Sequence, residues 1–339
     1  MTSRLDRAEG ALLGLAIGDA LGMPTQLLSR GQVIAEYGVI SGFEPASATH
    51  PIAAGMPAGS VTDDTHQALI LARLLIAGSG TVNPKDFATA LRVWEAEMAA
   101  TGSLDLLGPS TRAALQALLD GVPPEESGRE GVTNGAAMRV APVGVAYPPR
   151  PLARLVRAVV DVDRVTHNTT IANAGASAVA AAVSVGVEGG SVADAAEAAV
   201  TAARLGGAAG QAVPGADVAT RIAWACDLVL ADSADPAEDD DVLSLVDRLV
   251  GTSMATQESV PAAFAILMRH RDDPWAACCA AASLGGDSDT IAAMAGAVAG
   301  ACHGAGAFPR EAVAALRRVN PGLGLRDLAA GLLTLRDSA

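Results

Sequence analysis

The sequence is poor in aromatic residues, although it is rich in other apolar ones. Aromatic residues make up 3% of its 339 positions, whereas hydrophobic residues make up 50%. The apolar side chains are mostly alanine, valine and leucine, which favours many closely packed helices over a sheet protein. No stretch alternates apolar and polar residues strongly enough to predict a strand. The composition therefore predicts an all-α fold.

Basic residues are also scarce. The 23 Lys and Arg residues are outnumbered by 37 Asp and Glu residues, which gives a formal net charge of −14, and Lys85 is the one lysine. Because binding to nucleic acid requires a basic face, this balance argues against a nucleic-acid partner. We attribute the shortage of lysine to genome composition. The acidic run over 232–241 is interpreted as a solvated loop.

Patterns that indicate disulfides, zinc sites or export are missing as well. Four cysteines lie in apolar contexts without metal-ligand spacing, and we interpret them as reduced, buried thiols: Cys226, Cys278, Cys279 and Cys302. The charged first ten residues do not resemble a signal peptide. The uncharged stretch 290–308 is rich in Ala and Gly and is interpreted as a buried helix, not as a membrane span. We therefore expect a cytoplasmic protein that is not embedded in a membrane.

Two acidic clusters of similar form stand near opposite ends of the chain. Thr62–Thr65 reads TDDT and Asp287–Thr290 reads DSDT, and each begins an apolar helix pattern. Asp and Thr are common helix starters, because their oxygens accept from unpaired backbone N–H groups. Capping does not, however, require the second acid of each cluster. Two such clusters together favour a shared site over simple capping.

The chemistry of that site follows from its charge. If the clusters meet, four carboxylates share one small volume, and at an effective dielectric of about 20 a pair roughly 4 Å apart repels by about 4 kcal/mol. Two divalent cations would neutralise this charge. Because the ligands offered are all oxygen, they suit Mg²⁺, Mn²⁺ or Ca²⁺ and not zinc.

The clusters also decide between one domain and two. A chain of this length suggests about two domains. A site shared by residues near 63 and 288, however, requires both ends of the chain to belong to the same domain. We therefore predict a single domain over 1–339. Helices are predicted at 5–22, 64–77, 84–100, 110–120, 151–163, 168–186, 191–205, 216–231, 240–255, 260–270, 273–283, 289–303, 310–318 and 325–336, with irregular segments at 29–60 and 121–150.

Glycines recur every four residues near both ends of the chain. They are Gly10, Gly14, Gly18 and Gly22, and then Gly296, Gly300 and Gly304. Each glycine weakens a helix by about 1 kcal/mol, so a compensating gain is expected, and close approach of two helix backbones supplies one. We expect the two terminal helices to pack together in the centre of the molecule. Asp19 would then lie near the acidic clusters and support them.

Five segments carry a family resemblance. They are GALLGLAIGDALGMP (10–24), SVTDDTHQALILARLL (60–75), GVTNGAAMRVAPVG (131–144), THNTTIANAGA (166–176) and SLGGDSDTIAAMAGAVAGACHG (283–304). Together they resemble the ADP-ribosylglycohydrolase family, which includes the dinitrogenase reductase-activating glycohydrolase and the vertebrate ADP-ribosylarginine and ADP-ribosylserine hydrolases. The resemblance implies one orthogonal multi-helix domain with two Mg²⁺ or Mn²⁺ ions in a central cleft. It also implies hydrolysis of a glycosidic bond to ADP-ribose or a related ribosyl group.

The resemblance also implies roles for individual residues. The metal ligands would be Thr62, Asp63, Asp64, Asp287, Asp289 and Thr290, with Asp289 as the bridge. The substrate contacts would be Asn134, Gly135, Met138, Arg139 and His167, and Gln26 is added to them. The catalytic carboxylates would be Asp105, as the acid/base, and Asp64.

One position departs from the family pattern. Gln26 stands where many members carry a glutamate, and a glutamine cannot act as a general base, although it can orient a substrate. Two alternatives therefore remain beside the main hypothesis. The first is a small-molecule ribosidase that acts on nucleoside-like metabolites. The second is a catalytically inactive ribosyl-binding or structural homologue. The expected partner is an ADP-ribosylated protein or a small ribosyl compound, and the sequence leaves the oligomeric state open.

Overall fold

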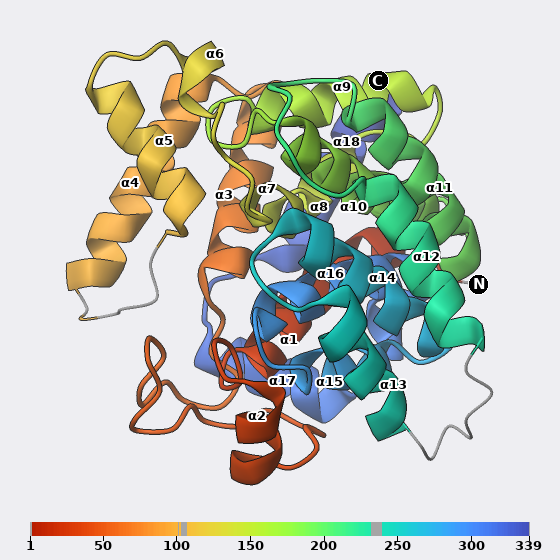
Figure 1. Ribbon diagram of the computed structural model, residues 1–339. Coiled ribbons are helices and arrows are strands. Elements are labelled where there is room, and N and C mark those ends of the chain that lie inside the picture. The colour runs from red at the N-terminus through yellow and green to blue at the C-terminus, as the bar shows by residue number, and fades with distance from the viewer. Residues whose placement is uncertain (1, 101, 103–106, 232–238, 339) are drawn as a thin grey trace.

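The computed structural model describes residues 2–100, 102, 107–231 and 239–338. Within these residues the regular elements are helices, and two isolated β-bridges, Thr133–Ala255 and Thr169–Gln211, stand in place of strands. The helices pack side by side in one body (Figure 1). One apolar core contains residues from Ala8 to Leu333, as a single domain would require. The predicted all-α fold is confirmed.

The helix bounds follow the apolar periodicity of the sequence. They are α1 (Arg4–Gly22), α2 (Arg30–Glu36), α3 (Asp63–Ala77), α4 (Pro84–Ala100), α5 (Pro109–Leu119), α6 (Pro124–Ser127), α7 (Gly135–Arg139), α8 (Ala141–Ala146), α9 (Leu152–Asp163), α10 (Thr170–Val187), α11 (Val192–Gly206), α12 (Val218–Ala231), α13 (Asp239–Leu245), α14 (Thr256–Arg269), α15 (Pro274–Ala282), α16 (Ser288–His303), α17 (Arg310–Val319) and α18 (Leu325–Ser338).

The structure corrects the predicted helices in a few places. The stretch 240–255 forms α13 and the π-helical turn η2 (Val246–Val250), which stops at Gly251 because that residue has a φ of +87°. Helix α14 begins earlier than predicted, where the backbone N–H of Asn134 donates to the carbonyl of Met254 at 3.0 Å. The segments predicted as irregular contain α2, α6, α7 and α8. These helices are too short for their periodicity to show in the sequence.

Helices α1 and α16 pack backbone to backbone, as the glycine spacing predicts. A Cβ added at Gly14 would lie 2.7 Å from the carbonyl carbon of Gly296, and one at Gly10 would lie 2.7 Å from that of Gly304. Real side chains do not approach so closely, so only glycine fits this contact. The contact brings the two ends of the chain together, and both labels lie at the centre of Figure 1.

Helix α10 forms part of the same core. By length and composition it passes for a membrane-spanning helix, but 89% of that stretch is buried inside the protein. Such burial is typical of a core helix. The four cysteines are free and buried, in line with the expectation of reduced thiols.

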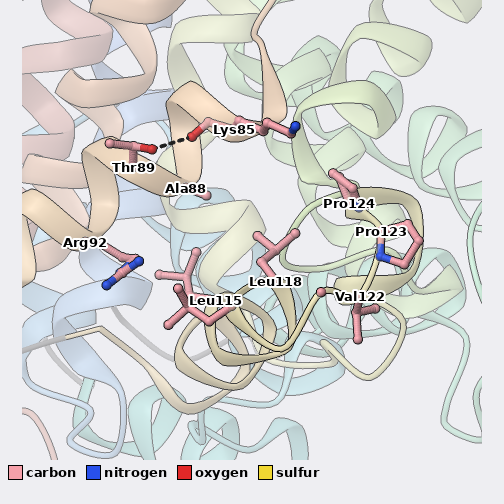
Figure 2. Close-up of a pocket in the computed structure, with 11 residues that line it drawn as sticks. Lys85, Ala88, Thr89, Arg92, Leu115, Leu118, Val122, Pro123 and Pro124 are labelled. Atoms are coloured by element: carbon pink, nitrogen blue, oxygen red, sulfur yellow. Dashed lines mark hydrogen bonds between the residues drawn. The ribbon is translucent and has the colours of Figure 1, made fainter.

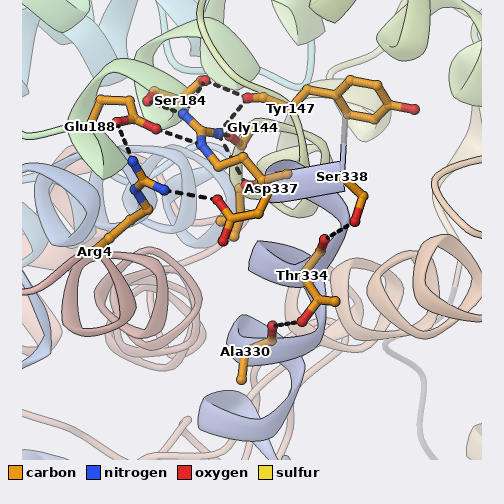
Figure 3. A network of polar contacts seen from close by, with 11 residues as sticks. Arg4, Gly144, Tyr147, Ser184, Glu188, Ala330, Thr334, Asp337 and Ser338 are labelled. Atoms are coloured by element: carbon orange, nitrogen blue, oxygen red, sulfur yellow. Dashed lines mark hydrogen bonds and ion pairs between the residues drawn. The ribbon is translucent and has the colours of Figure 1, made fainter.

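The last helix is tied to the body by one buried arginine. Arg336, 5% exposed, donates to the carbonyl oxygens of Gly144, Val145 and Ser184 at 3.0–3.1 Å, and its Nε pairs with Glu188 at 2.8 Å. Figure 3 shows this network beside the end of α8. These carbonyls belong to the last turns of α8 and α10, where helix carbonyls have no partner within the helix. Arg336 therefore caps two helices at once.

Candidate active site

The structure brings the two acidic clusters together. Thr62 and Asp287 are the N-cap residues of α3 and α16, so both clusters lie at helix starts. The hydroxyl of Thr290 donates to Oδ2 of Asp64 at 3.3 Å. Residues far apart in the sequence thus share one site, because the α1–α16 contact places the start of α16 beside the start of α3.

A cavity of about 280 Å³ opens at this junction. Most of the predicted site residues line it: Gln26, Asp63, Asn134, Gly135, Met138, Asp287, Asp289 and Thr290. Apolar side chains from separate loops, Leu27, Ile52 and Met254, also line it. The cavity therefore combines carboxylates and amides with apolar side chains.

The carboxylates of the two clusters repel one another, although Asp64 lies behind the cavity wall and not in it. Asp64 is fully buried, and burial raises its pKa well above the ordinary value, while the charges of Asp289 and Asp63 raise that pKa further. Burial also raises the pKa of Asp287, against a lowering hydrogen bond from Asn134. Oδ1 of Asp64 is buried and accepts no hydrogen bond. A buried, unpaired carboxylate oxygen is costly unless a cation or donor completes it.

Asp19 holds the acidic cluster of α3 from behind. Its carboxylate accepts from the backbone N–H of Thr62 at 2.9 Å and from that of Thr65 at 3.1 Å, and also from both hydroxyls. Thr62 makes no capping hydrogen bond with its own side chain, so Asp19 of α1 supplies the cap of α3. The pKa of Asp19 is raised to about 6, because the effect of burial outweighs the lowering effect of these hydrogen bonds. Asp19 therefore supports the cluster, as expected from the sequence.

Asn134 joins the Gly-rich loop to the second cluster. Its Nδ2 donates to Oδ2 of Asp287 and also lies 2.9 Å from the hydroxyl of Ser259. Gly135 follows directly, and a Cβ at this position would lie 2.9 Å from Cε1 of His167. The loop can therefore approach His167 only because it has glycine here.

Arg139 and His167, which were predicted to contact substrate, do not line the cavity. Both are fully buried behind the loop, and neither belongs to the cavity wall described above. His167 pairs through its ring nitrogens with Thr133 at 3.1 Å and Thr166 at 2.9 Å, and burial lowers its pKa well below the ordinary value. Met138 and Arg139 are consecutive residues of α7, so their side chains leave the helix about 100° apart, and only Met138 lines the cavity. Asp105, the predicted acid/base, lies outside the described residues.

The sequence reasoning missed the start of α5. Gly108, Thr111 and Arg112 line the cavity, and Thr111 is 2% exposed. Leu107, just before the helix, also belongs to the wall. A proline at the first helical position signals this helix start, but nothing local shows that the start faces the acidic clusters.

The donor set suits hard divalent cations in its chemistry. Among the described residues, no three His, Cys, Asp or Glu side chains already converge in metal-ligand geometry. The side chains of the two clusters nevertheless offer carboxylate and hydroxyl oxygens, as Mg²⁺ and Mn²⁺ prefer. The bare oxygen of Asp64, beside Thr290 and Asp289, is an observation that such an ion would explain.

A second cavity, of about 460 Å³, lies between α4 and α5 (Figure 2). Its wall is made of apolar side chains, the basic residues Lys85 and Arg92, and Thr89. It offers no carboxylate and no amide group, so its chemistry differs from that of the acidic cavity. The acidic cavity is the better candidate for catalysis.

Comparison with known proteins shows the family of the chain. The family model for ADP-ribosylglycohydrolases matches residues 1–339. The chain belongs to this family. A solved structure described as an ADP-ribosylglycohydrolase-related protein complex covers 99% of each chain with a TM-score of 0.71 at 26% identity. The fold and the family resemblance read from the sequence are both confirmed.

Curated relatives of this chain cover different shares of its length. The Escherichia coli protein YegU is 35% identical over 94% of this chain and 93% of its own. The ADP-ribosyl-[dinitrogen reductase] glycohydrolase of Rhodospirillum rubrum is 30% identical over 50% of this chain and 54% of its own. The ADP-ribosylarginine hydrolase Tri1 of Pseudomonas putida is 34% identical over 42% of this chain and 36% of its own. The chain is thus a glycosidase-type hydrolase of a generally metal-dependent family.

Proposed function

We propose that the chain is a divalent-metal-dependent hydrolase that cleaves the glycosidic bond between an acceptor and ADP-ribose or a related ribosyl group. The observation that carries the proposal is the meeting of Asp63, Asp287 and Asp289 in one cavity with the Gly-rich loop at Asn134. Named relatives that act on ADP-ribosylated dinitrogen reductase and on ADP-ribosylarginine support an ADP-ribosylated protein as substrate.

The chain's own residues supply binding and electrostatics. The amide of Gln26 and the backbone at Gly135 lie in the cavity wall, where they can donate to ribosyl hydroxyls or phosphate oxygens. Asn134 also lies in the wall, but its amide N–H groups already donate to Asp287 and Ser259. Nε2 of Gln26 is buried without a hydrogen-bond partner, so it is a donor available to a ligand. Because glutamine cannot take up a proton as a base, its role in the proposal is to orient the substrate.

The carboxylates act on the charge that develops in the reaction. Cleavage of a glycosidic bond passes through an oxocarbenium-like state with positive charge at the anomeric carbon, and nearby carboxylates stabilise it. The residues that would hold Mg²⁺ or Mn²⁺ are Thr62, Asp63, Asp64, Asp287, Asp289 and Thr290. When bound, such an ion would supply a Lewis acid that orients oxygen ligands and makes water more acidic. Asp105 stays the predicted acid/base, and Leu107, close to it in the sequence, belongs to the cavity wall.

The size of the cavity bears on the substrate. At about 280 Å³ it is at the lower end of small-molecule pockets. It would therefore enclose the ribosyl end and leave the acceptor outside, which suits either a protein or a small acceptor. Nucleoside-like metabolites accordingly remain the second candidate substrate.

A substrate panel tests the proposal. The purified protein is offered arginine-, serine- and phosphate-linked ADP-ribose and nucleosides, each with Mg²⁺ or Mn²⁺ and again with chelator. Release of a ribosyl product that chelator stops, and that Asp63→Asn reduces by at least about 100-fold, is the expected result. Lys85→Met, in the other cavity, serves as a control and should keep full turnover. Release of no product from any of these compounds would overturn the proposal and favour an inactive ribosyl-binding protein.

A further inference from the structure

The acidic wall is backed by a buried row of polar side chains. Asp63 lies in the wall, and Gln67 is on the next turn of α3 with no exposed surface. A spacing of four residues puts both side chains on one helix face. Nε2 of Gln67 donates to Oδ2 of Asp63 at 2.6 Å. One oxygen of this cavity carboxylate is thus held from the protein side.

Arg139 determines which way the amide of Gln67 points. Its Nη1 donates to Oε1 of Gln67 at 3.0 Å. A guanidinium offers only donors and a carboxylate only acceptors. A reversed amide would therefore place NH₂ against the guanidinium and C=O against Asp63. Gln67 has one favourable orientation, and it is the one that donates to Asp63.

Arg139 is itself held through both of its Nη atoms and by an aromatic ring. It is fully buried, its guanidinium lies 4.9 Å from the ring centre of Phe87, and its Nη2 donates to Thr166. Burial lowers its pKa to about 10, while the charges of Asp163 and Asp63 raise it, so the residue stays protonated near neutral pH. A fixed positive charge therefore stands behind the negative wall of the cavity.

The second cluster has a comparable partner. Nδ2 of Asn134 donates to Asp287 and to the hydroxyl of Ser259. Each cluster thus has a carboxylate that accepts from a buried amide, and an amide can orient a carboxylate without neutralising it. For Asp63 the amide is not part of the cavity wall, so its function is separable from contact with substrate.

We propose that Gln67 and Arg139 are positioning residues that fix the carboxylate of Asp63 as a ligand for a divalent cation. The inference rests on the proposed function, and it gives Arg139 a role other than substrate contact. Loss of such outer partners typically weakens metal binding about 10–100-fold. The predicted effect therefore appears in metal affinity itself, before any turnover.

Gln67→Glu tests the inference in the full-length protein. The variant keeps the shape of the side chain but sets a carboxylate against Asp63. We expect Mn²⁺ to bind at least about 10-fold more weakly by calorimetry, and the electron paramagnetic resonance signal of bound Mn²⁺ to change. Gln67→Met, which removes the donor without adding charge, should weaken binding in the same direction. Circular dichroism and thermal unfolding without metal show whether each variant is folded.

Helix α5 offers a matched control. Nε2 of Gln116 donates to Oδ1 of Asp120 at 3.0 Å with the same spacing, on the exposed surface. Gln116→Glu makes the same chemical change away from the cavity and should leave Mn²⁺ affinity unchanged. A folded Gln67→Glu protein with wild-type Mn²⁺ affinity would overturn the inference, as would loss of the folded state in both Gln67 variants. Wild-type protein that binds no Mn²⁺ would overturn the proposed metal-dependent function, so the two failures are distinguishable.

Discussion

Replacing Gly22 with alanine should push α1 away from the start of α16 and disturb the acidic cavity. A Cβ at Gly22 would lie 2.6 Å from the carbonyl carbon of Ser288, whereas ordinary contacts fall at 3.4–4 Å. The other close atoms belong to the backbone of Asp289, which no side-chain rotation can move. The two helices must therefore separate by most of an ångström at the point where α16 presents Asp289 and Thr290.

The size of both effects follows from that displacement. Overpacking a close contact typically lowers the free energy of unfolding by about 1–3 kcal/mol. In large domains each kcal/mol lowers the unfolding temperature by about 2–4 °C, so a fall of roughly 2–12 °C is expected. A misplacement of about 1 Å at reacting groups reduces turnover by about 10²-fold. Gly22→Ala should therefore lose far more activity than its modest loss of stability explains.

Thermal unfolding and metal-dependent release of ribosyl product are the measurements. Gly14→Ala creates the same kind of clash with Gly296, farther from the cavity, and should reduce stability with a smaller loss of activity. Gly31→Ala on α2 is the control, because nothing lies within 4 Å of the added Cβ. It should leave stability unchanged or raise it by about 0.5–1 kcal/mol. Wild-type stability and turnover in Gly22→Ala would refute the claim that backbone contact at this glycine aligns the clusters.

Three further predictions concern buried charges. Arg336→Met should lower the free energy of unfolding in urea by about 3–5 kcal/mol, because it strands several buried carbonyls, whereas Arg4→Met, with a side chain 47% exposed, should stay within about 1 kcal/mol. Burial raises the pKa of Asp163 from 3.8 to about 7, so ionised Asp163 destabilises the fold increasingly as pH rises from about 4 to 7. Asp163→Asn should accordingly gain stability over wild type at pH 8 and lose that advantage at pH 4; an equal difference at both would contradict this. Asp64→Asn should raise the unfolding temperature of the metal-free protein, since one repelling charge is gone, and should lose the further rise that Mn²⁺ gives the wild type.

Local sequence patterns carried much of the fold. The apolar period of 3.6 residues predicts the long helices, because that period depends only on which residues share a helix face. The four-residue glycine spacing predicts the α1–α16 contact. Glycines destabilise a helix, and on an exposed helix no close backbone contact would offset that loss. The similar clusters at Asp63–Asp64 and Asp287–Asp289 predict a shared acidic site, because one cluster alone needs no second acid.

Tertiary packing decided the rest of the site. The short helices α7 and α8 have too few residues to show the apolar period of a helix, and all of their residues are buried. Their helical conformation therefore depends on packing against the rest of the protein. For the same reason the sequence did not show that Met138 faces the cavity while Arg139 faces Gln67. The start of α5 with Thr111 and Arg112 reaches the cavity only because α4 and α5 pack on a small core of their own around Phe87 and Leu91.

The sequence by itself therefore determined the class of fold, the family and the acidic groups available for chemistry. All three depend on residue types at fixed local spacing. Only the tertiary structure decided which polar side chains form the wall and which stand behind it. That choice depends on the angles at which distant helices pack, and no local spacing encodes those angles.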